Sequence, residues 1–244
     1  MNGDLNEIWV YLSTTPLLGL TLTLIAYQAA FWIYKRLGFH PLANPVLIAV
    51  AMLASVLLLT GTPYTTYFDG AQFVHFLLGP ATVALAIPLH AQWPRLKAMA
   101  GPLLISLLAG SLTAALSAYA IGAALGASRE SLMSLAPKSV TTPIAMAVAE
   151  RLGGLPSLTA VLVIMTGILG AVGARYIYQW LRIEDHAVRG FAIGIASHGI
   201  GTARAFQVSE QAGAFAALAM GLNGLVTALS LPWILPWIES LLNR

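Results

Sequence analysis

The sequence contains no cysteine among its 244 residues. Disulfide bonds, thiol chemistry and cysteine-based metal sites are therefore excluded. Charged residues are also scarce, at 9%, whereas a soluble globular domain carries about 25%. With 58% hydrophobic residues and a mean hydropathy of +0.81, the chain lacks the polar surface that a water-soluble protein needs. These shortages exclude a disordered protein, a soluble enzyme and a nucleic-acid-binding protein, and they predict an integral membrane protein.

Motifs for catalysis and metal binding are missing as well. The sequence has no P-loop, no HExxH and no GxSxG pattern, so we expect neither an enzyme nor ATP-driven transport by this chain alone. His75 and His90 are too isolated to form a metal site, and we expect no metal and no cofactor. The segment Met1–Glu7 has no basic residue, unlike the start of a cleaved signal peptide. The first apolar segment is therefore expected to remain as a membrane helix.

Long stretches without charge indicate the membrane helices, because crossing the hydrocarbon core takes about 20 apolar residues. We predict an all-α polytopic membrane protein with about 5–8 membrane segments. Plain helices are expected at residues 14–35, 44–61, 98–126, 156–181 and 214–240. No polar linker divides the chain. Residues 1–244 are therefore predicted to form a single membrane domain, with an N-terminal helix region at 1–43 and a core at 44–240.

Three further apolar stretches are interrupted by glycine or proline and contain polar residues. They cover residues 66–93, 128–152 and 186–211. Irregular backbone at membrane depth is tolerated only inside protein or beside an aqueous cavity. Interrupted segments also mark the binding sites of many transporters. We expect two or three broken or re-entrant helices, with breaks at Gly79-Pro80, Ala136-Pro137 and Gly199-Ile200-Gly201.

Two of these breaks resemble each other. The runs Leu78–Val83 and Leu135–Val140 share the pattern Leu-small-Pro-x-hydroxyl-Val, at an offset of 57 residues. Many transporter folds contain such repeats. A match of six residues leaves both an internal repeat and a coincidence open.

Basic residues indicate the cytoplasmic side, where Lys and Arg accumulate in membrane proteins. Arg95 and Lys97 are expected on that side. Arg175, Arg182 and Arg189 share it only if residues 128–152 form a re-entrant hairpin. A full crossing by that segment would invert the second half of the chain.

Lys138 is the most informative polar residue, because an ionisable group at membrane depth is costly and usually functional. Pro137 is expected in the first turn of a helix, with Ser139, Thr141 and Thr142 around its start. The N–H groups and partial positive charge of a helix start bind anions, and the lysine would complete an anion site. In the alternative reading, Lys138 extends to the membrane interface and the hydroxyls only cap the backbone.

A second polar stretch contains Ser197, His198, Thr202 and Arg204. The guanidinium of Arg204 suits a carboxylate, and His198 can exchange protons near neutral pH. In the alternative reading, Arg204 pairs with Glu210 or lipid headgroups, and His198 is an ordinary buried histidine.

Three other residues are weaker candidates. Thr82 follows Pro80 at another expected helix start and could bind substrate. Glu150 could couple transport to protons, or it could simply neutralise Arg151. Asn223 lies among glycines of the last helix, where it could bind substrate or serve helix packing.

Three stretches carry a resemblance to a known family: Leu78–Leu89, Pro137–Ile144 and Ala196–Ala205. Together they resemble the LrgB/CidB family, which includes the bacterial YohK-type proteins. The chain is also similar to the carboxyl-terminal part of the plant plastidial glycolate/glycerate translocator. The resemblance runs from about Asn44 to Trp233 and implies a multi-pass protein of the bacterial inner membrane.

The resemblance implies two different functions. One is transport of small monocarboxylates such as glycolate, glycerate or pyruvate, coupled to protons or to a counter-anion. The other is holin-like or antiholin-like control of murein hydrolases and cell lysis, with a small LrgA/CidA-type membrane partner. A lysine and an arginine beside broken helices suit a carboxylate carrier better than a holin. We therefore expect a carrier in the lipid bilayer, as a homodimer, with hydrolase control as the alternative.

Overall fold

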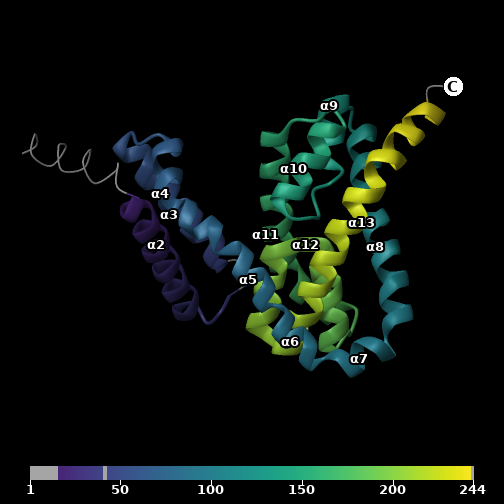
Figure 1. Cartoon of the computed structure of the whole chain (residues 1–244), viewed down its shortest axis with the longest axis horizontal. Coiled ribbons are helices and arrows are strands. Elements are labelled where there is room, and N and C mark those ends of the chain that lie inside the picture. The colour runs from purple at the N-terminus through teal and green to yellow at the C-terminus, as the bar shows by residue number, and fades with distance from the viewer. Residues whose placement is uncertain (1–15, 41–42, 243–244) are drawn as a thin grey trace, which may run out of the picture. The chain divides into compact units, whose positions relative to one another are not determined.

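The computed structural model describes residues 16–40 and 43–242, which form α-helices and no strand (Figure 1). The chain divides into two compact units, residues 1–84 and 85–244. The N-terminal unit contains α2 (Pro16–Arg36), α3 (Pro45–Thr60), α4 (Tyr64–Phe76) and α5 (Leu78–Ala84). The C-terminal unit contains α6 (Ala86–Ala91), α7 (Trp93–Ala98), α8 (Ala100–Ala124), α9 (Arg129–Leu135), α10 (Thr142–Arg151), α11 (Pro156–Trp180), α12 (His186–Val208) and α13 (Glu210–Leu242).

Four of these helices, α2, α8, α11 and α13, are long and apolar enough to cross a membrane. The number rises to five if the apolar stretches Tyr64–Val74 and Gly79–Ala91 form one span. The predicted all-α polytopic membrane protein is thereby confirmed, and the five plain helices lie where the charge-free stretches placed them. The part of the first predicted helix before residue 16 lies outside the described residues. The single domain over residues 1–244 stays a prediction.

The N-terminal unit is held together by close contacts of α2 with α3 and α4. A Cβ on Gly19 of α2 would lie 2.7 Å from the main-chain oxygen of Tyr67, so only glycine allows α4 to approach this closely. The hydroxyl groups of Thr23 and Tyr67 are 2.7 Å apart and join the same two helices. Asn44 caps α3, because its Oδ1 accepts hydrogen bonds from the second and third helical N–H groups.

The break predicted at Gly79-Pro80 is wrong in position. The chain leaves the helix at Leu77 instead, and α5 continues through Gly79 and Pro80. Pro80 lies in the first turn of α5, where the missing N–H group leaves no helical hydrogen bond unmade.

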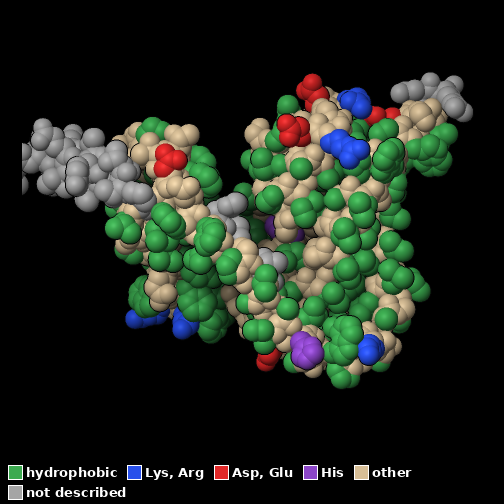
Figure 2. Space-filling view, in the orientation of Figure 1, with side chains coloured by type: hydrophobic (Ala, Val, Ile, Leu, Met, Phe, Trp, Pro, Cys, Tyr) green, Lys and Arg blue, Asp and Glu red, His purple; other side chains and the backbone are tan. Residues whose placement is uncertain are grey.

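Two ion pairs mark the two ends of the C-terminal unit. Arg95 Nη2 lies 2.6 Å from Asp185 Oδ2 at one end, which we call the Arg95 end. Arg129 makes two hydrogen bonds of 2.9 Å to the carboxylate of Glu239 at the other, the Arg129 end. The 25 residues of α8 run between the two ends, a length of about 37 Å. Figure 2 shows charged side chains gathered at both ends and hydrophobic side chains between them, as expected for a membrane-spanning unit.

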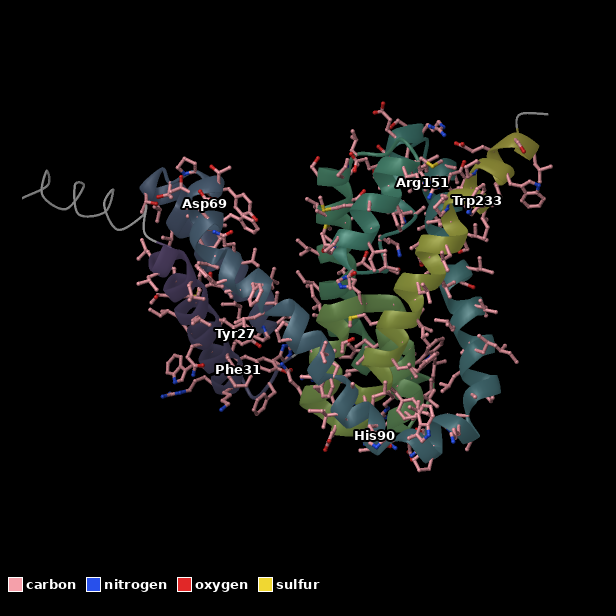
Figure 3. The ribbon with its side chains drawn as sticks, in the orientation of Figure 1. Tyr27, Phe31, Asp69, His90, Arg151 and Trp233 are labelled. Atoms are coloured by element: carbon pink, nitrogen blue, oxygen red, sulfur yellow. The ribbon has the colours of Figure 1, made fainter. Side chains whose placement is uncertain are left out.

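The charges at each end are stabilised locally. Hydrogen bonding to Glu239 raises the pKa of Arg129. Partial burial tends to raise the pKa of Asp185, but N–H groups of the following helix and the Arg95 guanidinium lower it more, so the net pKa lies below its ordinary value. At the Arg129 end, the Arg151 guanidinium lies 5.8 Å from the centre of the Trp233 ring. Figure 3 labels both residues.

The segment from α9 to α10 forms a re-entrant hairpin, which we call hairpin A (residues 129–151). Met133 of α9 and Val148 of α10 belong to one buried cluster, so the two short helices pack against each other. Between them, residues 136–141 turn without helical structure. Hairpin A opens toward the Arg129 end, where α9 begins and α10 ends. The predicted break at Ala136-Pro137 is therefore confirmed.

The helix α12 is a second hairpin, which we call hairpin B (residues 186–208). Its backbone leaves the helical region at Ser197 (φ −131°, ψ 17°) and His198 (φ 41°, ψ −134°). Ile193 and Ala205 pack in one buried cluster, although a straight helix would hold them about 18 Å apart. A Cβ on Gly201 would lie 2.8 Å from the Ile193 main-chain oxygen, so glycine permits the close contact of the two arms.

The break in this stretch therefore exists, but not at Gly199-Ile200-Gly201 as predicted. Gly199 and Gly201 already belong to the second arm of hairpin B, and the reversal occurs two residues earlier. The glycines serve the contact between the arms rather than the turn itself.

The C-terminal unit is built from an inverted repeat. The helices α8 and α11 have 25 residues each and start 56 residues apart. They run in opposite directions. Each is followed by a hairpin that enters the unit from the end at which the helix finishes and returns to that same end. Their buried faces correspond at the same offset: Leu103, Leu107, Ser111 and Ala115 of α8 match Thr159, Val163, Gly167 and Ala171 of α11.

This repeat is not the one that the sequence motif suggested. Leu78–Val83 lies in α5, whereas Leu135–Val140 forms the end of α9 and the turn of hairpin A. The two motif copies therefore have different structures. The structural repeat has a similar offset of 56 residues, but it relates α8 with hairpin A to α11 with hairpin B.

Candidate functional site

The tips of the two hairpins meet beside Asn223 of α13. Asn223 Nδ2 donates one hydrogen bond to the main-chain oxygen of Ser139, at the tip of hairpin A, over 3.3 Å. It donates a second to the main-chain oxygen of Ile195, near the tip of hairpin B, over 3.0 Å. Asn223 is 1% exposed, and its Oδ1 has no hydrogen-bond donor among the described residues. A single buried amide thus joins two chain reversals that enter from opposite ends.

Val163 of α11 contacts both hairpin tips from the other side. Its side chain packs against Val140 and Ala145 of hairpin A in a buried cluster. Its main-chain oxygen lies 2.8 Å from His198 Nε2 of hairpin B. A long helix and a buried amide therefore hold the two tips in the interior of the unit.

Lys138 lies in the tip of hairpin A and is half-buried. Its ammonium group donates a hydrogen bond of 3.3 Å to the hydroxyl of Ser139, and among the described residues it makes no ion pair. Such a lysine has further N–H donors for an anionic group. The predicted position of Pro137 in the first turn of a helix is wrong, because α10 begins only at Thr142.

The start of α10 explains this difference. Thr141 is the N-cap residue and Pro143 occupies the first turn, where proline is favoured. Pro137 instead follows the end of α9, whose helix it cannot continue without an N–H group. Thr141 and Thr142 are half-buried at this helix start, one turn of chain after Lys138.

At the tip of hairpin B, Ser197 and His198 are buried against α11. The ring of His198 passes over Gly167, where a Cβ would lie 2.7 Å from the imidazole. A Cβ on Gly170 would overlap Ser197 Oγ, which is fully buried and has no partner among the described residues. The positive φ of His198 is unusual for a residue other than glycine, and such backbone is concentrated at functional sites.

The remaining candidates are distributed differently. Thr202 is buried one turn after His198, and its hydroxyl donates to the His198 main-chain oxygen over 2.8 Å. Arg204 lies further along the second arm and lines a cavity whose lining does not include Lys138. Glu150 is exposed near the last turn of α10, at the Arg129 end. Thr82 belongs to α5 of the other unit, and its side chain lies outside the described residues.

Sequence reasoning missed the residues that support the tips from α11. Val163 acts through its main-chain oxygen, which leaves no signal in a sequence. Gly167 and Gly170 did leave one, because glycine in a helix interior is destabilising and often marks a close approach of another segment. Together with Ile195, they complete the surroundings of the predicted residues Lys138, Ser139, Ser197, His198 and Asn223.

Comparison with known proteins decides the family. The profile described as "LrgB-like family" matches residues 23–237, which is most of the chain. The chain belongs to the LrgB-like family. Both hairpins and every tip residue described above lie within the matched region of this LrgB-like chain.

Relatives of this LrgB-like chain match over nearly their whole length. The "Uncharacterized protein YwbG" of Bacillus subtilis strain 168 is 36% identical over 222 residues, 91% of this chain and 98% of that protein. YxaC of the same strain is 36% identical over 82% of this chain and 87% of its own. The "Antiholin-like protein LrgB" of Bacillus mycoides strain KBAB4 is 30% identical, over 92% and 97%. No solved structure matches the chain.

Proposed function

We propose that this protein is a secondary carrier for small monocarboxylates such as glycolate, glycerate or pyruvate. The observation that carries the proposal is the meeting of two opposed re-entrant hairpins beside a half-buried lysine, inside an inverted repeat. Carriers commonly place their substrate site at the interface of such repeats, on interrupted helices near the middle of the membrane. Transport, rather than catalysis, is the activity that this arrangement suits.

In the proposed site, the tip residues have different roles in binding the substrate. Lys138 attracts the substrate carboxylate, and the hydroxyls of Ser139, Thr141 and Thr142 donate hydrogen bonds around the start of α10. Ser197 supplies another hydroxyl from hairpin B, and Asn223 holds the two tips in register while its Oδ1 remains available to a substrate hydroxyl. Thr202 fixes the backbone after His198.

Coupling to protons is proposed for His198, which is the titratable group at the tip of hairpin B. Anion binding near a histidine favours its protonated form, so substrate and proton would bind together. Glu150 is the weaker coupling candidate because it is exposed at the end of hairpin A. Exchange against a counter-anion would use the same lysine without any proton.

The second candidate function is antiholin-like control of murein hydrolases, and one kind of observation favours it. The relatives whose names describe an activity are called antiholin-like protein LrgB. These names favour the second candidate more directly than they favour transport. For both candidates we propose the inner membrane of a bacterium, a homodimer and, for lysis control, a small LrgA/CidA-type membrane partner.

Transport assays with the purified chain separate the two candidates. Proteoliposomes that contain only this protein should take up radiolabelled glycolate, glycerate or pyruvate at a saturable rate while retaining an entrapped dye. Liposomes with Lys138→Ala protein serve as the control, because this change removes the charge and is expected to leave the fold intact. Dye release that parallels carboxylate flux would contradict the carrier and favour a membrane lesion.

A further inference from the structure

A second candidate site lies at the Arg95 end of the C-terminal unit, apart from the hairpin tips. A cavity of about 260 Å³ opens between α11 and both arms of hairpin B. Three arginines line it: Arg175 of α11, Arg189 of the first arm and Arg204 of the second arm. None of the described residues that line the cavity is acidic. The cavity therefore gathers three positive charges around a space too small for a large ligand.

Arg189 is held in place at the edge of this cavity. Its Nε donates a hydrogen bond of 2.6 Å to the main-chain oxygen of Ile183. The guanidinium lies 5.8 Å from the ring centre of Tyr178, and the Tyr178 hydroxyl donates to the Arg189 main-chain oxygen over 2.8 Å. A guanidinium that is already fixed loses less conformational entropy when it binds an anion.

The other two arginines line the cavity from α11 and from the second arm of hairpin B. Arg175 makes neither a hydrogen bond nor an ion pair within the described residues. Arg204 Nη1 donates to the neutral amide of Gln207 over 3.1 Å. Asp185, the acidic residue at the start of hairpin B, is occupied by Arg95 and by the first N–H groups of that helix. An anion in the cavity would offset the positive charge of the arginines that line it.

The folding of hairpin B is what creates this cluster. Arg189 and Arg204 are 15 residues apart, and a straight helix would separate them by about 22 Å. The reversal at Ser197 and His198 brings them to the same cavity, opposite Arg175. Arg95, Lys97 and Arg182 lie at the same end, so the positive-inside tendency places this cavity on the cytoplasmic side.

We propose that the arginine cavity binds a phosphate group. The planar fork of a guanidinium matches the oxygens of a phosphate in pairs, and a phosphate monoester carries about −1.5 to −2 charges. A monocarboxylate carries only one, which leaves more of the cluster unneutralised. The cavity is smaller than the roughly 300–1,000 Å³ of sites for drug-sized ligands, which suits a single small group.

Two sources can provide this group: the headgroup of an anionic phospholipid in the cytoplasmic leaflet, or a soluble phosphate compound. In both cases the bound phosphate links α11 to both arms of hairpin B and stabilises the folded unit. The inference does not rest on transport activity, because the cavity lining contains neither Lys138 nor Asn223.

The test uses the full-length protein in a neutral detergent and in lipid nanodiscs. In detergent, inorganic pyrophosphate is titrated by calorimetry at constant ionic strength, with chloride and glycolate as comparison anions. In nanodiscs of phosphatidylglycerol and phosphatidylcholine, the lipids that stay bound after extraction are counted by native mass spectrometry. Arg175→Gln and Arg204→Gln are compared with Arg182→Gln, which removes the same charge at the same end but outside the cavity.

We expect Arg175→Gln and Arg204→Gln each to weaken binding by about tenfold or more, and Arg182→Gln to change it little. Loss of pyrophosphate binding in these variants assigns a soluble phosphate compound. Loss of retained phosphatidylglycerol assigns a lipid headgroup. The proposal is overturned if phosphate is not preferred over chloride and glycolate in detergent and phosphatidylglycerol is not preferred over phosphatidylcholine in nanodiscs. Equal effects of all three variants overturn it as well, because they would indicate attraction by general charge.

Discussion

Asn223 Nδ2 lies 3.0 Å from the main-chain oxygen of Ile195 and donates a hydrogen bond to it. The same nitrogen also binds Ser139, so one side chain of α13 closes the contact between the tips of hairpins A and B. Main-chain oxygens at a chain reversal have lost their helical partners and must be satisfied by another donor when they are buried. Asn223 meets this requirement for both hairpins at once.

Removal of this amide should destabilise the protein. Asn223→Ala removes the hydrogen bonds that this side chain donates to two main-chain oxygens, and a buried group left unsatisfied costs about 1–3 kcal/mol. Thermal unfolding in detergent should therefore occur at a clearly lower temperature than in the wild type. Ser230→Ala is the matched control, because its hydroxyl only donates to Val226 within the same helix. Equal unfolding temperatures for both variants would mean that the tips do not depend on Asn223.

Two glycines of α11 should respond in opposite directions to the same substitution. Gly170→Ala places a Cβ where Ser197 Oγ lies, so the tip of hairpin B must move and the unfolding temperature should fall. Gly173→Ala places a Cβ in open space, and alanine favours a helix over glycine by about 1 kcal/mol. This control variant should be as stable as the wild type or more so. A Gly170→Ala protein of unchanged stability would contradict the close packing of hairpin B on α11.

Lys138→Ala should remove substrate binding while the protein still inserts and folds. A hydrogen bond from an ammonium group to a carboxylate contributes about 1.5–3 kcal/mol, which corresponds to a loss of affinity of about ten- to 150-fold. Lys97→Ala, an exposed lysine at the Arg95 end, is the control. Binding and uptake of radiolabelled glycolate are the measurements. Wild-type uptake by Lys138→Ala would show that the lysine only extends toward the membrane interface.

The pH dependence of transport tests His198. If this histidine carries the coupled proton, uptake should increase as the pH falls from about 8 to 6, around the ordinary histidine pKa of about 6.5. His198→Gln should flatten this dependence, yet its amide can still donate to the Val163 oxygen that His198 contacts, so the tip should stay folded. His198→Ala, which cannot, should unfold more easily. A wild-type pH profile in His198→Gln would exclude His198 from coupling.

The sequence allowed prediction of the membrane helices because their signal is local. Charge-free stretches of sufficient length gave α8 and α11 within two residues, and the proline and glycine residues indicated three interruptions. The exact breaks were less accurate. Pro80 and Gly201 were placed at breaks, whereas the structure uses Pro80 to start α5 and Gly201 to bring two arms together. Glycine and proline permit several local structures, and the surrounding contacts select one of them.

The sequence was sufficient to predict several residues of the candidate site, but not their positions relative to one another. Lys138, Ser197, His198 and Asn223 were all selected as polar groups in apolar surroundings. Nothing in the sequence indicated which of these residues lie close to one another in the folded protein. Arg204 was expected beside Lys138, and it instead lines the cavity with Arg175 and Arg189. The supporting carbonyls of Val163 and Ile195 carry no sequence signal, because every residue has one.

The amino-acid sequence was sufficient to predict that this chain is an integral membrane protein, that it is helical, and where its long helices lie. Those properties follow from the composition of single segments, since apolar length and the scarcity of charge act locally. Three other features became apparent only in the folded protein: residues 186–208 turn back on themselves, the two hairpins enter from opposite ends, and three distant arginines line one cavity. These features depend on contacts between residues far apart in the chain, such as Asn223 with Ser139 and Gly170 with Ser197, which no local pattern of side chains specifies.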